Sequence, residues 1–223
     1  MPPPTRAIED YLKVIHDLAR GADRVTTGAL AERLGVTPAS ATGMAKKLAE
    51  MRLVEHVPYG GVVLTEPGRR IAVETIRHHR LVETYLHEAL GVPWDRLHAE
   101  AERWEHVLSE DVEARMDAAL GFPTHDPHGA PIPTPALDLT EPVWPALGAL
   151  AAGTEGAVAE VRDEDADLVR AAGACGLFPG TRLHVEAAAP GVRVRLLDGP
   201  QADAVHPVAE ALAGVVTVRP DDG

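Results

Sequence analysis

The sequence predicts a mainly α-helical protein with small β elements: a winged helix-turn-helix, two long helices and a small C-terminal β-barrel. Apolar residues at helical spacing dominate the chain before Phe122. Seven prolines follow between Phe122 and Pro145, a density typical of a connector without regular structure. Short β-like runs fill the remainder of the 223 residues, a length that accommodates one to two domains or three small modules.

The first elements come in the order helix, helix, short turn, helix, hairpin, which is that of a winged helix-turn-helix. Thr27 is the expected N-cap of the second helix, and Thr37 precedes Pro38 at the start of the third. Gly21 and Gly35 are typical ends for the first two helices. The expected elements are helices over 6–20, 28–34 and from 38 onward, and strands over 53–57 and 62–65 around a turn at 58–61.

Two long helices are expected in the middle of the chain. The first starts at Pro67 and ends near Gly91, and the second starts at Pro93. Such helices after a small DNA-binding unit usually pair with each other or with a second subunit. The apolar ridge expected on the second helix consists of Leu97, Ala101, Trp104, Leu108 and Val112.

The part after Gly153 has the pattern of a small β domain. A curled antiparallel barrel of about 70 residues accounts for it most simply. The β-like runs cover 157–161, 182–185, 192–197 and 215–218, and one short helix covers 166–172.

The net charge of −13 is unevenly distributed. Residues 1–73 carry +2, residues 74–140 carry −8 and residues 141–223 carry −7. Only the N-terminal third therefore tolerates a phosphate backbone, whereas the acidic middle attracts cations.

No apolar stretch approaches the roughly 20 residues that a membrane-spanning helix needs, and no signal peptide is readable. Cys175 is the only cysteine, which excludes an intrachain disulfide. We therefore expect a soluble cytoplasmic protein without membrane association. The sequence contains no metalloprotease, serine hydrolase, P-loop or dinucleotide motif, so no enzyme is expected.

Histidines and glutamates recur at spacings that suit a metal ion. On one continuous helix after Pro93, four of them share a sector about 100° wide, at 100° per residue. The preceding helix carries His79 and Glu83 one turn apart. Imidazoles and carboxylates on one face are ligands for a divalent ion, but they also simply cover the solvent side of acidic helices, and both interpretations stay open. The four residues of the sector are His98, Glu102, Glu105 and His106.

The helix after Pro38 has the composition of a DNA-recognition helix. Small hydroxyl side chains stand near its N-terminus, and Lys46 and Lys47 follow where phosphates would lie. A protein-interaction role for a winged helix is the alternative. The residues expected to contact DNA are Thr27, Thr37, Pro38, Ala39, Ser40, Thr42, Gly43, Lys46, Lys47 and the hairpin residue Tyr59.

Three segments, 31–34, 79–83 and 103–107, together with His98, resemble the diphtheria toxin repressor family of metal-activated bacterial transcriptional repressors. The resemblance covers essentially the whole chain and implies an SH3-like or FeoA-like fold for the barrel. It implies a winged helix-turn-helix domain over 1–73, a helical metal-binding and dimerisation domain over 74–140, a proline-rich linker over 141–152 and the SH3-like/FeoA-like domain over 153–223.

The resemblance also implies two metal sites per subunit. Leu168 stands where some iron-type members carry a glutamine ligand. The implied primary site consists of Asp10, Glu102, Glu105 and His106. The implied ancillary site consists of His79, Glu83, His98 and an acid of the third domain, for which Asp165 is the best match and Glu164 the next.

Two positions distinguish metals within the family. Asp10 and Glu102 stand where iron-type members carry Met and Cys, and an oxygen and imidazole set suits Mn²⁺. Lys13 stands where manganese-type members tend to carry an acidic residue that helps to hold a second ion. The lysine therefore favours two separate metal sites, primary and ancillary, over two ions bound close together. We therefore expect a homodimeric, Mn²⁺-activated repressor of a double-stranded DNA operator.

Three alternatives stay open at this stage. The metal is Fe²⁺ in an iron-dependent repressor of the same family, or the acidic face is the site of a metallo-hydrolase. In the third, the barrel docks onto the proline-rich segment 123–145 or onto the ancillary metal site.

Overall fold

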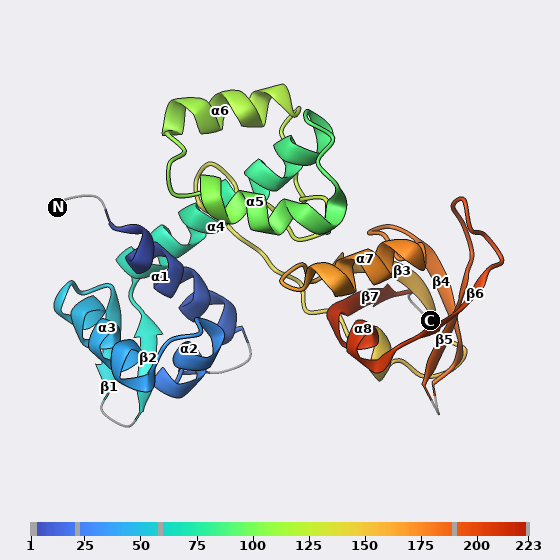
Figure 1. Cartoon of the computed structure of the whole chain (residues 1–223), viewed down its shortest axis with the longest axis horizontal. Coiled ribbons are helices and arrows are strands. Elements are labelled where there is room, and N and C mark those ends of the chain that lie inside the picture. The colour runs from blue at the N-terminus through green and yellow to red at the C-terminus, as the bar shows by residue number, and fades with distance from the viewer. Residues whose placement is uncertain (1–3, 21–22, 58–59, 189–190, 222–223) are drawn as a thin grey trace. The chain divides into compact units, whose positions relative to one another are not determined.

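The computed structural model describes residues 4–20, 23–57, 60–188 and 191–221 (Figure 1). The chain divides into two units. Unit 1 comprises residues 1–79, 105–108 and 133–139, and unit 2 comprises residues 80–104, 109–132 and 140–223.

Unit 1 has the predicted winged helix-turn-helix order. Leu12, Ile15, Leu30 and Leu48 are fully buried and join the helices to the hairpin through Val62. In that antiparallel hairpin Val54 pairs with Leu64. The elements are α1 (Arg6–Ala19), α2 (Thr27–Arg33), α3 (Pro38–Glu50), β1 (Val54–Val57), β2 (Gly61–Leu64) and the first part of α4 (Glu66–Glu88).

The helix starts differ in one detail from the prediction. The N-cap of α2 is Thr26, not Thr27, because the Thr26 hydroxyl accepts a hydrogen bond from Ala29 N. The expected cap of α3 is confirmed, since Thr37 accepts from Ser40 N. Gly35 follows α2 with φ +63° and ends it as predicted. The predicted helix end at Gly21 lies outside the described residues.

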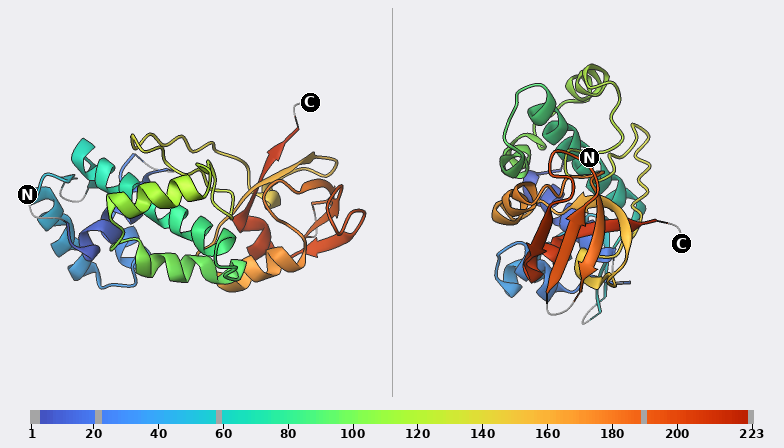
Figure 2. Two further views of the ribbon diagram at one scale, coloured as in Figure 1. Left: turned by 90° about the horizontal axis from the view of Figure 1, so that it is seen from above. Right: turned by 90° about the vertical axis from the view of Figure 1, so that its right-hand side faces the viewer.

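Unit 2 contains the C-terminal antiparallel sheet in the order β6-β5-β4-β3-β7, with α7 and α8 beside it (Figure 2). Its core is built from alternate strand residues such as Leu183, Val185 and Val194. The sheet is consistent with an SH3-like domain, as the fold class predicted. Its elements are β3 (Glu155–Val161), α7 (Ala166–Ala174), β4 (Arg182–Ala187), β5 (Val192–Leu196), β6 (Val205–Val208), α8 (Glu210–Val215) and β7 (Val216–Pro220).

The prediction of one continuous helix after Pro93 is wrong. The chain forms η1 (Trp94–Arg96) and α5 (Leu97–Trp104), turns at residues 105–107, and begins α6 (Glu110–Ala119). Ser109 is extended and three acids in the first turn of α6 favour a new helix start there. Trp104 and Val112, expected on a buried ridge, are therefore exposed.

Between Ala119 and β3, the described residues form only isolated bridges and the short η2 (Leu147–Ala149). This connector is hydrogen-bonded to the barrel within unit 2. Val161 N donates to His128 O at 2.9 Å, and Val218 N donates to Pro145 O at 3.0 Å. Among the described residues, no helix is long and apolar enough to cross a membrane.

Candidate metal centre

Three predicted ligands, Asp10, Glu105 and His106, meet in unit 1 and are called the Asp10 cluster here. His106 Nε2 lies 2.9 Å from Asp10 Oδ1 and 3.3 Å from Glu105 Oε1, yet it makes no hydrogen bond of acceptable geometry with any described residue. Its Nδ1 lies 2.6 Å from Glu9 Oε2. Neighbouring ligand atoms of one ion, each about 2.1 Å from it, lie about 3 Å apart. The cluster therefore has the spacing and the atoms of a cation site.

The local chain explains how these ligands meet. Asp10 lies on α1, one turn after Arg6 and 3.9 Å from it. Glu105 and His106 lie in the turn after α5 rather than on a helix face. The helical geometry that first placed them in one sector with His98 and Glu102 is therefore wrong, although Glu105 and His106 do lie beside Asp10.

Glu105 has a resident cationic partner, Lys13. The Lys13 ammonium donates to both Glu105 oxygens, at 3.1 and 2.8 Å, and lies 3.2 Å from His79 Nδ1. His79 Nδ1 also makes a close contact with Glu105. Burial by itself raises the pKa of Glu105, but His79 and Lys13 outweigh it and lower that pKa to about 2. Glu105 is therefore held ionised inside unit 1.

Glu102, the fourth ligand expected at the primary site, lies on α5 in unit 2. There its Oε1 is 3.8 Å from His98 Nε2, one helical turn away. Glu102 thus belongs to unit 2, whereas Asp10, Glu105 and His106 belong to unit 1.

A second cluster in unit 2 contains Glu83, His98 and Asp163, whose ligand atoms lie within 4.8 Å of one another. His98 Nδ1 is 3.2 Å from Asp163 Oδ2. His79 stands one turn before Glu83 on α4. The cluster thus contains Glu83 and His98, two of the helical residues of the predicted ancillary site, together with an acid from the C-terminal domain.

That acid is not the predicted one. Asp165 is exposed and caps α7, where its Oδ1 accepts from Asp167 N at 2.9 Å and Leu168 N at 3.3 Å. Asp163, two residues earlier, reaches His98 instead. The sequence did contain a signal for this outcome. A helix was predicted to start at Ala166, and Asp is a preferred N-cap residue, so Asp165 could have been expected to cap that helix.

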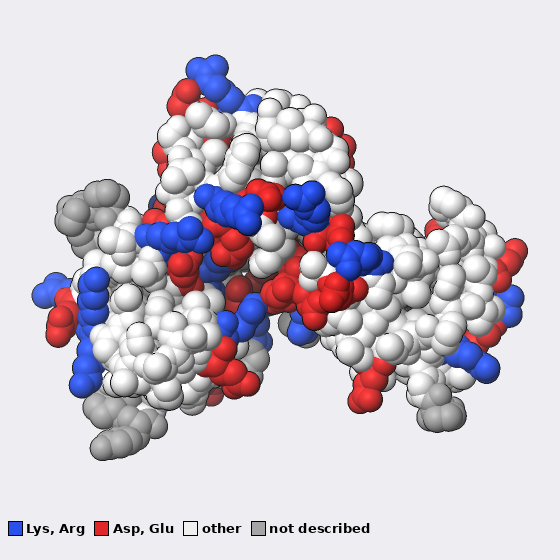
Figure 3. All heavy atoms as spheres, in the orientation of Figure 1, with Lys and Arg blue, Asp and Glu red and all other residues white. Residues whose placement is uncertain are grey.

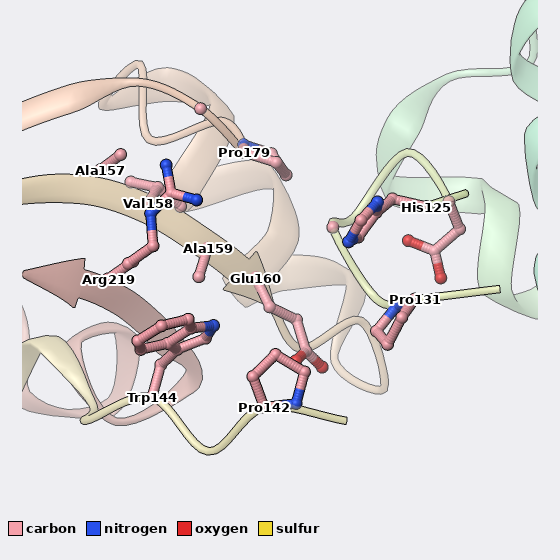
Figure 4. A pocket seen from close by; sticks show the side chains of 13 residues that line it. His125, Pro131, Pro142, Trp144, Ala157, Val158, Ala159, Glu160, Pro179 and Arg219 are labelled. Carbon is pink, nitrogen blue, oxygen red and sulfur yellow. The ribbon is translucent and has the colours of Figure 1, made fainter. Parts of the chain in front are cut away.

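Sequence reasoning missed two residues of unit 2, Asp126 and His128. Both are buried, and with Glu83 they form a further group of possible ligands. Near them, a cavity of about 350 Å³ lies between the connector and β3, lined by Pro131, Pro142, Trp144, Glu160 and Arg219 among others (Figure 4). No periodic pattern marks residues 123–132, so only their composition, His-Asp-Pro-His, offered a signal.

The recognition helix α3 exposes most of the residues predicted to contact DNA. Figure 3 shows basic and acidic side chains interspersed on the face of unit 1 that it draws. Two of the hydroxyls are already hydrogen-bonded: that of Thr37 accepts from Ser40 N, and that of Thr42 donates to Pro38 O at 2.8 Å. Tyr59 lies outside the described residues. Thr27 and Thr42 are half-buried, and the exposed members are Thr37, Pro38, Ala39, Ser40, Gly43, Lys46 and Lys47.

Comparison with known proteins bears directly on these clusters. Residues 5–62 match the family model "Iron dependent repressor, N-terminal DNA binding domain", and residues 65–134 match "Iron dependent repressor, metal binding and dimerisation domain". The iron-dependent repressor IdeR of Mycobacterium tuberculosis is 35% identical over 192 residues, 80% of this chain and 83% of its own length. The chain belongs to the iron-dependent repressor family.

This repressor resembles manganese-dependent relatives as well. The transcriptional regulator MntR of Escherichia coli is 38% identical over 105 residues, 47% of this chain and 67% of its own length. A solved structure of a manganese-dependent transcriptional repressor in complex with manganese is 39% identical, with a TM-score of 0.88, and covers 96% of this chain and 99% of that one. The resemblance seen in the sequence is confirmed.

The repressor is thus a metal-dependent transcriptional regulator that binds DNA through its N-terminal domain and dimerises through its middle domain. Members of its family are transcriptional repressors. The matched metal-binding region, residues 65–134, includes Glu83, His98, Glu105 and His106.

Proposed function

We propose that this repressor is activated by Mn²⁺, bound at a primary site by Asp10, Glu102, Glu105 and His106. The observation that carries the proposal is the Asp10 cluster, in which a buried imidazole nitrogen without a hydrogen bond to any described residue faces two carboxylates. These donors are hard oxygens and an imidazole, which suit Mn²⁺, and none is a sulfur atom. The manganese complex of the relative that is 39% identical supports the same metal.

We propose a second ion at the ancillary site, bound by His79, Glu83, His98 and Asp163. Asp163 replaces the Asp165 chosen from the sequence. The proximity of His98 to Asp163, at 3.2 Å, supports this set within unit 2, and the one-turn spacing on α4 supports His79.

The residues of the primary site suggest how metal controls DNA binding. A bound divalent cation supplies two positive charges to a site where Glu9, Asp10 and Glu105 gather around His106. With this repulsion removed, α1 is held against the turn that carries Glu105 and His106. In the homodimer, the two α3 helices then meet half-sites one DNA turn apart, about 34 Å.

An iron-dependent repressor is the second candidate. The observations that favour it are the 35% identity to IdeR and the cluster of Glu83, His98 and Asp163, because an ancillary site of this kind is expected of iron-type relatives. Equal activation of DNA binding by Fe²⁺ and Mn²⁺ under anaerobic conditions would support an iron-dependent repressor.

The experiment that tests the proposal is metal-dependent DNA binding by full-length protein. The probe is a duplex selected from a random pool by the Mn²⁺-loaded repressor, at fixed salt, with Mn²⁺, Fe²⁺, Co²⁺ and Zn²⁺ compared. Glu102→Ala and His106→Ala are expected to remain folded dimers and to lose Mn²⁺-stimulated binding. Stimulation retained in either variant would refute the assignment.

We also propose the four-part organisation with boundaries after residues 73, 140 and 152, action in the cytoplasm where operator DNA lies, and docking of the connector on the barrel. The hydrogen bonds from Val161 and Val218 to the connector support the docking. Limited proteolysis of the metal-free and Mn²⁺-loaded protein tests the boundaries, because cleavage concentrates where chain segments are accessible.

A further inference from the structure

The cavity of about 350 Å³ in unit 2 has a largely apolar lining (Figure 4). Trp144 of the connector contributes an indole ring, and β3 contributes Ala157 and Ala159, whose small side chains leave space in front of the strand. Natural small-molecule sites have volumes of about 300–1,000 Å³ and combine an apolar lining with a few polar groups. The cavity has that size and that kind of lining. Three proline rings complete the apolar part, those of Pro131, Pro142 and Pro179.

Backbone hydrogen bonds hold the walls of the cavity in place. Gly180 N donates to Val158 O at 2.8 Å, which fixes the segment before β4 against β3. Val218 N donates to Pro145 O at 3.0 Å, which fixes the connector beside Trp144 to β7. A ligand therefore meets walls that are already ordered, and it loses little binding free energy to rearrangement.

Arg219 brings a positive charge to this cavity. It lies on β7, where its register partner is Ala157 of β3, and its side chain is exposed. Among the residues that the structure describes, none forms an ion pair or a hydrogen bond with the Arg219 side chain. A guanidinium presents its donors in a planar fork that matches the two oxygens of a carboxylate. One end of the cavity thus suits a carboxylate.

The opposite charge lies elsewhere in the lining. Glu160 stands three positions after Ala157 on β3, and Figure 4 shows it beside Pro142, whereas Arg219 lies beside Ala157 and Val158. The glutamate repels an anion at its own end, so a negative group on a ligand is favoured only near Arg219. The proline rings and the indole provide the apolar surface for the rest of the ligand, and an indole packs well on an aromatic ring.

We propose that this cavity binds a small aromatic carboxylate, with the carboxylate on Arg219 and the ring against Trp144. The inference goes beyond the proposed function, because the site contains none of the proposed metal ligands. A bound ligand contacts the connector through Trp144 and the barrel through β3 and β7. It therefore stabilises the contact between the connector and the barrel.

The test uses metal-free full-length protein labelled with fluorotryptophan and observed by fluorine NMR. The chain has three tryptophans, and the spectrum of Trp144→Phe identifies the resonance of Trp144. The probes share one ring and differ in charge: phenylacetate, neutral phenylacetamide and cationic phenethylamine. We expect phenylacetate to shift the Trp144 resonance in a saturable way and to bind most tightly, and phenethylamine to bind most weakly.

Three variants separate the contributions of charge and space. Arg219→Gln should weaken phenylacetate binding roughly tenfold and leave phenylacetamide binding unchanged, because a charge-assisted pair is lost. Arg193→Gln is the matched control, since Arg193 is an exposed arginine on β5 that does not line the cavity. Ala157→Leu, which fills the space, should remove the binding of both probes.

Two results overturn the proposal: no saturable shift of the Trp144 resonance, or equal phenylacetate affinity in wild type and Arg219→Gln. Either result leaves the cavity as a gap in the packing of connector and barrel. Failure of the proposed function is a separate outcome, because it appears as Mn²⁺-stimulated DNA binding in His106→Ala.

Discussion

The ammonium of Lys13 lies 2.8 Å from Oε2 of Glu105, a carboxylate whose side chain is completely buried. Lys13 also lies 3.2 Å from His79 Nδ1, so one side chain of α1 supplies positive charge to two predicted metal ligands. The Lys13 side chain thus places a positive charge at the position where manganese-type relatives carry an acidic residue. Within unit 1, Glu105 is shared between Lys13 and the Asp10 cluster.

Replacing Lys13 with Ala is expected to strengthen Mn²⁺ binding at the primary site roughly tenfold, or about 1.4 kcal/mol. The reason is that the ammonium repels an incoming dication and engages both Glu105 oxygens. Isothermal titration calorimetry on the full-length protein measures this change. Lys46→Ala, on the exposed face of α3, is the matched control and should leave the affinity unchanged. Weaker binding in Lys13→Ala would show instead that Lys13 positions Glu105 for the metal.

The depressed pKa of Glu105 predicts an acid-dependent loss of stability in the metal-free protein. The folded-state pKa of about 2 lies below the ordinary value of 4.5, so the unfolded chain binds the proton more tightly. The Glu105 contribution is complete above pH of about 5 and is lost as the pH falls toward 2, at a total of about 3 kcal/mol.

Urea unfolding of wild type and Glu105→Gln between pH 2 and pH 7 checks this expectation. The difference in unfolding free energy should be largest near neutral pH and shrink steadily in acid, because glutamine has no proton to gain. A difference that does not vary with pH would mean that the Lys13 and His79 contacts do not depress the Glu105 pKa.

The sequence was sufficient for most of the fold because each N-terminal element carries its own local signal. Thr37-Pro38 marks the start of α3, and Gly35 marks the end of α2. Weak local signals account for the missed elements. β6 contains Pro207 and pairs on one side only, and the break before α6 depends on Ser109 and three following acids rather than on periodicity.

The site was harder to predict, because its ligands come from segments that only tertiary structure brings together. His98, Glu83 and Asp10 were found from residue type, spacing and resemblance. Asp163 and His128 were not, since the first stands among three consecutive acids and the second lies in a proline-rich connector without a repeat. The structure separates Asp165 from its neighbours Asp163 and Glu164, because the Asp165 side chain caps α7 and accepts backbone hydrogen bonds there.

Metal preference is expected to follow the two positions that distinguish iron-type from manganese-type relatives. The double variant Asp10→Met/Glu102→Cys introduces soft sulfur donors, which favour later transition metals over Mn²⁺. We expect activation by Fe²⁺ or Co²⁺ to rise at least tenfold relative to Mn²⁺, or by about 1.4 kcal/mol. Anaerobic fluorescence anisotropy with the selected duplex measures the ratio. An unchanged ratio would contradict the assignment of these two residues to metal choice.

DNA binding is expected to depend on salt through the lysines of α3. Lys46 and Lys47 are both exposed, so each is available to a phosphate. Lys46→Ala and Lys47→Ala should each reduce the slope of log K against log salt by about 0.9 per subunit and weaken binding to all sequences alike. Arg115→Ala on α6, where Arg115 pairs with Asp111, serves as control. A change confined to one operator sequence would indicate base contact in place of phosphate contact.

Gly129 of the connector lies very close to the backbone of β3. This residue has φ +94°, and a Cβ placed on it would lie 2.2 Å from Ala159 O of β3. Gly180 has a similar φ of +89° with open space around it, so Gly180→Ala introduces the backbone strain alone. Gly129→Ala should therefore be the more destabilising by about 1–3 kcal/mol, because rigid backbone must move. Calorimetric unfolding of the metal-free chain compares the two, and equal destabilisation would mean that the connector is not held against β3 in solution.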